Sequence, residues 1–90
     1  LKNNEGKELP PDPVVQLFPN PLGKGENLSI RADRNVLLQV YSVLGQKMSE
    51  PLFIPANQIY PLALQNMAAG LYIARFTHAG KSLALKFIIQ

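Results

Sequence analysis

The sequence contains no cysteine and no tryptophan, and its one histidine is His78. Without cysteine, a disulfide, a CxxC redox pair and a thiolate metal site are all excluded. His78 stands directly before Ala79-Gly80, and no acidic residue follows Glu50, so a histidine–carboxylate pair could form only between distant parts of the chain. An exposed turn histidine is the simpler interpretation. We therefore predict that the chain is not an enzyme and has no catalytic residue, metal site or cofactor.

Acidic side chains are few as well. From Pro13 onward, seven Lys and Arg residues stand against three acidic ones, Glu26, Asp33 and Glu50. The basic residues are scattered singly, whereas a nucleic-acid-binding surface clusters them with stacking aromatic residues. Glu26, Asp33 and Asn35 could in principle gather around calcium, but polar residues are ordinary in turns such as those predicted here. No nucleic-acid partner is expected.

No apolar run approaches the roughly 20 residues of a membrane-spanning helix, so no transmembrane segment is predicted. Residues 1–13 combine alternating Lys and Glu with three prolines near their end, which is the composition of an extended, stiffened linker. A chain that begins at Leu1 instead of Met is expected to be a fragment of a longer protein. We predict a linker from an upstream cargo domain at 1–13 and one folded domain at 14–90.

Short segments rich in β-branched and aromatic residues recur through the folded domain, each closed by turn residues, at the spacing of sandwiches and barrels. The predicted strands are Val14–Phe18, Asn27–Arg31, Val36–Val43, Lys47–Ile54, Ile59–Leu64, Leu71–His78 and Ser82–Gln90. Only 65–69 favours a helix, and five residues make no more than one turn. The fold class is therefore all-β, an antiparallel immunoglobulin-like β-sandwich of about seven short strands, with an open barrel as the alternative.

Turn and proline positions add detail to this fold. Pro19-Asn20-Pro21 ends the first strand, because proline lacks a backbone donor. Asp33-Arg34-Asn35 is predicted to connect a hairpin, and Ala79-Gly80 to close a tight one. Pro51 indicates a sheet edge or a bulge, and Pro61 indicates a sheet edge.

The aromatic residues divide into core and uncertain positions. Three phenylalanines on apolar alternating faces are expected in the core: Phe18, Phe76 and Phe87. Tyr41 and Tyr60 could be exposed. Tyr72 follows a turn at the start of a strand and is predicted to form a tyrosine corner, in which its hydroxyl bonds the backbone a few residues upstream. The last strand alternates most cleanly, with Leu83, Leu85, Phe87 and Ile89 on one face.

Several segments carry a resemblance in their order and spacing. They are Leu17–Pro21, Leu28–Ile30, Val40–Lys47, Met67–Ile73 and Lys81–Gln90. Together they resemble the type A C-terminal sorting domain of the Bacteroidetes type IX (Por) secretion system, and the likeness covers about Val14 to Gln90. Gln46 stands where an arginine often follows the Leu-Gly pair of that family, and the loop Leu22–Glu26 is long.

The resemblance implies a β-sandwich that directs an upstream cargo protein through the periplasm and outer membrane to the cell surface or the medium. It implies two partners, the outer-membrane type IX translocon and a gingipain-like processing peptidase. Residues expected to be recognised by the translocon are Pro19, Asn20, Pro21, Gly70, Leu71, Tyr72, Lys81, Lys86, Phe87, Ile88, Ile89 and Gln90. The alternative is a non-catalytic accessory module of a secreted hydrolase, which binds polysaccharide or packs on a neighbouring catalytic domain.

A mechanism for recognition follows from the last strand. A strand edge presents unpaired backbone groups that a partner sheet can extend. We expect the end of this strand to offer such an open edge, and Lys81 and Lys86 to steer an acidic partner toward it. Cleavage is expected in the linker or a little upstream, because a peptidase needs extended backbone.

Overall fold

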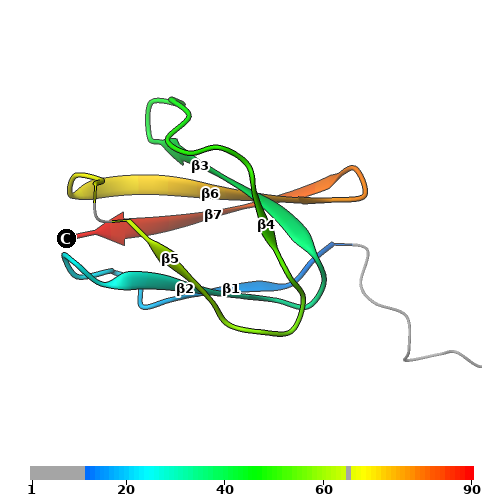
Figure 1. The fold of residues 1–90 in the computed structure, drawn as a ribbon. Helices are drawn as coiled ribbons and strands as arrows, with labels where there is room; N and C mark the ends of the chain where they lie inside the picture. Colours follow the sequence, from blue (N-terminus) through cyan, green and yellow to red (C-terminus); the bar gives the residue numbers. More distant parts are fainter. Residues whose placement is uncertain (1–11, 65) are drawn as a thin grey trace, which may run out of the picture.

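The computed structural model describes residues 12–64 and 66–90, which form seven strands and no helix (Figure 1). The strands are β1 (Val15–Phe18), β2 (Asn27–Ala32), β3 (Val36–Ser42), β4 (Leu52–Ile54), β5 (Tyr60–Ala63), β6 (Gly70–His78) and β7 (Lys81–Ile89). A three-stranded sheet has the order β1-β2-β5 and a four-stranded sheet the order β4-β3-β6-β7, and all named pairs are antiparallel. The all-β sandwich is confirmed, and its immunoglobulin-like type stays a prediction.

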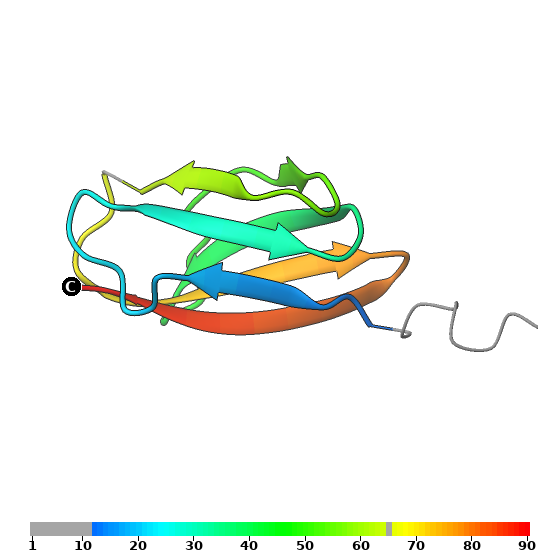
Figure 2. The ribbon, with the colours of Figure 1, turned by 90° about the horizontal axis from the view of Figure 1, so that it is seen from below.

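The core lies between the two sheets. Figure 1 shows β6 and β7 above β1 and β2, and Figure 2, seen from below, shows β5, β2 and β1 side by side in front of the other sheet. Successive residues of a strand point to opposite faces of its sheet, so alternate side chains enter the core from each sheet. The buried apolar residues are Leu22, Leu28, Ile30, Ala32, Val36, Leu38, Val40, Ile54, Tyr72, Ala74, Phe76, Phe87 and Ile89. The face of β7 that carries Leu83, Leu85, Phe87 and Ile89 is therefore the one that turns toward the core.

The prediction of a hairpin at Asp33-Arg34-Asn35 is wrong. β2 pairs with β1 and β5, whereas β3 pairs with β4 and β6, so this connection crosses from one sheet to the other. Turn residues specify a local reversal of the chain, and they do not specify which sheet the next strand joins. The crossover is held by the Asp33 carboxylate, which accepts a 3.0 Å bond from Val14 N and two bonds, of 3.1 and 3.0 Å, from the Arg34 guanidinium.

These contacts predict a pH dependence of folding stability. Hydrogen bonds from the Arg34 side chain hold the pKa of Asp33 below its ordinary 3.8, against an opposing effect of burial and with a further lowering contribution from Val14 N. As the pH falls, the unfolded chain therefore binds a proton at Asp33 before the folded chain does. The stability that the ionised Asp33 adds is complete above its unfolded pKa of 3.8 and is lost as the pH falls through its lower pKa in the folded chain. Urea titrations of the unchanged chain and of Asp33→Asn should differ at pH 6 and converge in acid. A constant difference at every pH would contradict this.

The edge predictions and the last hairpin are confirmed. β4 and β5 lie at sheet edges, and Ala79 and Gly80 join β6 to β7 with φ values of 50° and 79°. Both φ values are positive, as the tight turn between two long antiparallel strands requires. Gln65 lies outside the described residues, and 66–69 form a turn.

One aromatic prediction is wrong. Phe76 and Phe87 are fully buried, but Phe18 is 40% exposed. Val15 and Leu17 pack against the core from β1, and strand alternation then turns Phe18 to the opposite side. Tyr41 and Tyr60 are half-buried.

Candidate functional site

Three segments far apart in the sequence meet at one end of the sandwich. We call this region the convergent end and define it as residues 19–22, 70–72 and 86–90. The start of β6 pairs with the end of β7, so that Gly70, Leu71 and Tyr72 lie opposite Ile89, Ile88 and Phe87. The segment after β1 contacts the other edge of β7. Eleven of the twelve residues predicted for recognition therefore lie together, all except Lys81.

Asn20 binds the β7 edge through its side-chain amide. Asn20 Nδ2 donates a 3.1 Å hydrogen bond to the carbonyl oxygen of Lys86, and Asn20 Oδ1 accepts a 3.1 Å bond from Ile88 N. The side chain thus supplies one donor and one acceptor, as a neighbouring strand would. Asn20 is flanked by two cis peptide bonds, Phe18–Pro19 and Asn20–Pro21.

Leu22 continues this pairing with its backbone. Leu22 N donates a 2.7 Å bond to the Ile88 carbonyl oxygen, and Gln90 N donates a 2.8 Å bond to the Leu22 carbonyl oxygen, in a parallel bridge. The Leu22 side chain is buried in the core. Sequence analysis assigned this residue only to a loop, although a single leucine between a proline and a glycine turn is a signal that the loop packs inward.

These four hydrogen bonds correct the expectation of an open terminal edge. From Lys86 to Gln90, the carbonyl oxygen of Lys86, both backbone groups of Ile88 and the N–H of Gln90 already have partners. A partner strand could bind there only by displacing Asn20 and Leu22. Alternate residues of an antiparallel strand point their backbone groups to the same edge, so the uncovered part of β7 is the region around Ser82 and Ala84.

Tyr72 forms the predicted tyrosine corner. Its hydroxyl donates a 2.6 Å hydrogen bond to the carbonyl oxygen of Ala68, four residues upstream. Its ring stacks on Phe87 with centroids 5.7 Å apart. Gly70, two residues before Tyr72, has a φ of 155°, a backbone conformation that residues with a Cβ atom rarely adopt. These contacts fix the turn before β6 against the end of β7.

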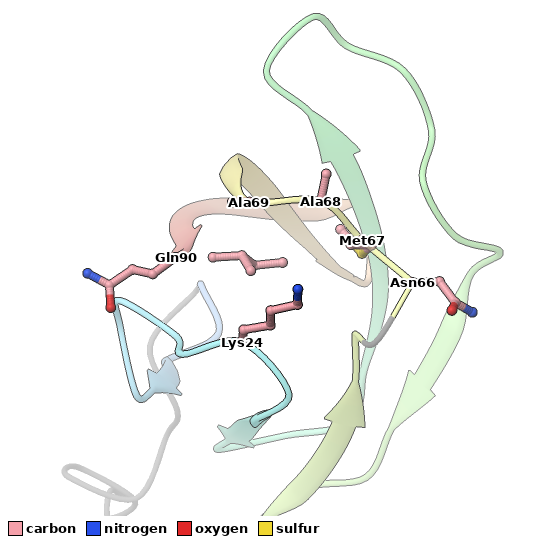
Figure 3. Close-up of a pocket in the computed structure, with 7 residues that line it drawn as sticks. Lys24, Asn66, Met67, Ala68, Ala69 and Gln90 are labelled. Carbon is pink, nitrogen blue, oxygen red and sulfur yellow. The ribbon is translucent and has the colours of Figure 1, made fainter.

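A hollow of about 470 Å³ adjoins the convergent end, and Figure 3 shows several of its lining residues. Its lining residues are Lys24, Asn66, Met67, Ala68, Ala69, Ile89 and Gln90. In Figure 3 the Lys24 side chain extends across the hollow toward the segment that carries Met67. The sequence placed Lys24 only within the loop Leu22–Glu26, and its position beside the last residues of the chain became visible only in three dimensions.

Lys81 lies at the opposite end of β7, where it pairs with His78 beside the hairpin turn. Lys81 is eight positions from Ile89 along this extended strand and five positions from Lys86, which is about 26 Å and about 17 Å at the usual rise per residue. Lys86 is exposed and faces outward from the four-stranded sheet. The two lysines therefore cannot act at the same point.

Polar residues outside these regions have local roles. His78 Nδ1 lies 2.9 Å from the carbonyl oxygen of Asn35, Glu26 accepts a 2.6 Å bond from Gly23 N, and Asn35 Oδ1 accepts a 2.8 Å bond from Ala56 N. Within 12–64 and 66–90, no three His, Asp or Glu side chains gather as a metal site would require. Nor does this described part contain a helix long and apolar enough to span a membrane.

Comparison with known protein families identifies the family to which the chain belongs. Residues 16–90 match the model of the secretion system C-terminal sorting domain, the Por secretion tail. The chain belongs to this family. A search of the curated proteins finds no match. The resemblance to a type IX sorting domain is confirmed, and with it the function of a sorting signal that directs a cargo protein to the cell surface or the extracellular space. Nothing in this match favours the alternative function, that of a non-catalytic accessory module of a secreted hydrolase.

Proposed function

We propose that the type IX translocon of the outer membrane recognises this sorting domain at its convergent end. The observation that supports the proposal is the meeting of 19–22, 70–72 and 86–90 through Asn20, Leu22 and the β6–β7 pairing. A signal shared by unrelated cargos must present one rigid shape, and these contacts hold three segments in a fixed relation. Lys81 lies too far away to belong to this surface, and we assign it only to charge steering.

At the convergent end, the exposed side chains that a partner could contact are different from the buried side chains that hold this end together. Tyr72, Phe87 and Ile89 are buried, so they support the surface from within. Pro19, Asn20, Pro21, Lys86 and Gln90 are exposed, as are Gly70, Leu71 and Ile88. Recognition by the translocon is therefore proposed to use this exposed set, with the buried aromatic pair as its support.

Replacing Asn20 by alanine tests the role of the amide. The change removes the two hydrogen bonds to Lys86 and Ile88, which should destabilise the domain by about 1–2 kcal/mol and loosen the end of β7. Export of an upstream reporter fused to the chain should fall severalfold, measured as reporter accessible at the cell surface. Amide exchange at Ile88 should become faster, since its hydrogen-bond acceptor is lost.

Asn27→Ala is the matched control, because Asn27 is an exposed asparagine on β2 and no side-chain hydrogen bond of it is found among the described residues. It should leave export and amide exchange at Ile88 unchanged. Export of the unchanged chain in cells without the translocon would contradict the proposed function. Equal export by Asn20→Ala and the unchanged chain, with faster exchange at Ile88, would show that the end need not be rigid.

We propose further that a gingipain-like peptidase separates the cargo from this domain within the linker at 1–13 or a little upstream. The proline-rich, charged composition of that segment supports an extended substrate. Pro13 is buried and Val14 N is bonded to Asp33, so the backbone is tied to the sandwich from this point on. N-terminal sequencing of the released domain should therefore place the cut before Val14. A cut within 14–90 would overturn the proposal.

A further inference from the structure

The outward side of the four-stranded sheet is unusually apolar for a solvent-facing surface. We call it the outer face. Four of its large apolar side chains are between 37% and 55% exposed, namely Leu37, Phe53, Leu71 and Ile88. Tyr41 and Ile73 lie half-buried opposite each other on β3 and β6 in the same face. An antiparallel sheet that faces only water normally alternates apolar inward and polar outward, so these residues need a different explanation.

The three-stranded sheet of the same domain shows what an ordinary solvent-facing side looks like. Its outward residues are Gln16, Phe18, Asn27, Ser29, Arg31, Pro61 and Ala63. Phe18 is the single large apolar side chain among them. The difference between the two sheets therefore does not arise from a generally apolar composition.

The outer face also has one sign of charge. Arg75 on β6 pairs with Ala84, and Lys86 follows two residues later on β7, so the two cationic residues occupy diagonal positions, whose backbones lie about 7–8 Å apart. The strands β3, β4, β6 and β7 contain no Asp or Glu. Within the described residues neither cation forms a salt bridge. Two neighbouring cations without an acidic partner repel each other mildly, and an incoming carboxylate would relieve this.

Two shallow hollows meet in the middle of this face. One, of about 430 Å³, is lined by Tyr41, Gly45, Ile73, Arg75, Ser82 and Ala84. The other, of about 220 Å³, is lined by Leu37, Leu38, Gln39, Tyr41, Pro51, Arg75 and Thr77. Both are bordered by Tyr41 and Arg75. These two residues are diagonal neighbours across β3 and β6, and tyrosine and arginine are among the residue types most enriched at the energetic centres of protein interfaces.

We infer that the outer face is a docking surface for a protein whose contact region places carboxylates among apolar side chains. The inference rests on the proposed function, since it supplies a surface by which the export machinery would hold the domain. The positive charge of Arg75 and Lys86 selects an acidic partner. The surrounding Leu37, Leu71 and Ile88 favour a protein over an acidic polysaccharide, because a sugar chain offers few apolar groups to cover them.

Charge reversal on opposite faces tests this surface. The 90-residue chain is fused to an upstream reporter, and Arg75→Glu is compared with Arg31→Glu, an exposed outward arginine on the three-stranded sheet. Arg75→Glu should lower the reporter at the cell surface about tenfold, because it sets a carboxylate against an acidic partner, whereas Arg31→Glu should leave it unchanged. Thermal unfolding of each variant shows whether it remains folded.

A second pair of variants tests the apolar contribution. Leu37→Ser alters the outer face, where Leu37 is 48% exposed. Ile59→Ser is the control, because Ile59 is similarly exposed, at 53%, but lies in the connection before β5. Leu37→Ser should reduce export and Ile59→Ser should not. The same four variants are titrated with acidic lipopolysaccharide, which serves as the polysaccharide probe.

Loss of export by Arg75→Glu and Leu37→Ser, with both controls normal, supports the inference. Normal export by all four variants overturns it and leaves the proposed function standing. Failure of the unchanged chain to carry the reporter overturns the proposed function and the docking surface together. A different outcome would assign the face to a polysaccharide and overturn the inference of a protein partner. In that outcome export is lost with Arg75→Glu but not with Leu37→Ser, and the domain binds lipopolysaccharide in a way that needs Arg75 but not Leu37.

Discussion

Replacing Phe87 by alanine should lower the free energy of unfolding by about 3–5 kcal/mol. Phe87 is fully buried and stacks on Tyr72 at 5.7 Å, so the change empties the place where β6 and β7 pack on the core. Domains of this size are stable by only about 5–15 kcal/mol, and the loss would remove a large share of that. Urea titration followed by circular dichroism should show a much lower midpoint, and export should fall with the folded fraction.

Phe53→Ala is the matched control for this substitution. Phe53 lies on the edge strand β4 and is 55% exposed, so its truncation should change the free energy of unfolding by no more than about 0.5 kcal/mol. Similar urea midpoints for the two variants would contradict the core described above. Because Phe53 belongs to the outer face, its variant could lose export while keeping full stability.

Deleting Lys86–Gln90 should abolish both folding and export. The deletion removes the buried side chains of Phe87 and Ile89 and all four hydrogen bonds that Asn20 and Leu22 make with this segment. Each buried side chain of this size contributes about 2–5 kcal/mol, so the sum approaches the whole stability of a small domain. The truncated chain should show no cooperative unfolding transition, and no reporter should reach the surface.

A double variant separates loss of fold from loss of recognition. Lys86→Gln with Ile88→Gln keeps the backbone bonds and both buried side chains and alters only outward ones. It should unfold within about 1 kcal/mol of the unchanged chain. Export that falls in this folded variant would show that outward side chains of β7 are read. A truncated chain that still unfolds cooperatively near the normal midpoint would contradict the assigned role of the segment.

Local patterns predicted most of this fold, because they depend on neighbours in the chain. The alternation of Leu83, Leu85, Phe87 and Ile89 sets which side of β7 enters the core. Pro51 and Pro61 exclude their segments from the middle of a sheet, since each lacks a backbone donor. The Tyr72 corner was predictable for the same reason, as its acceptor on Ala68 is only four residues away.

Phe18 shows how a local pattern can fail. An apolar residue next to Leu17 suggested burial, but successive residues of a strand point to opposite sides, and Val15 and Leu17 already occupy the inner one. The crossover at 33–35 failed for a related reason. Its turn residues would suit a hairpin equally well, and the choice of sheet also depends on β5 and β6, which begin 25 or more residues later.

By itself, the sequence determined the class of fold, the approximate places of the strands, most of their inward faces and membership of the sorting-domain family, since all of these follow from periodicity and ordered motifs. Only the tertiary structure decided how the edges are used. Asn20 and Ile88 lie 68 positions apart, and nothing local to either shows that one covers the other. The apolar outer face is likewise a property of four strands together, because exposure depends on what the rest of the fold leaves uncovered.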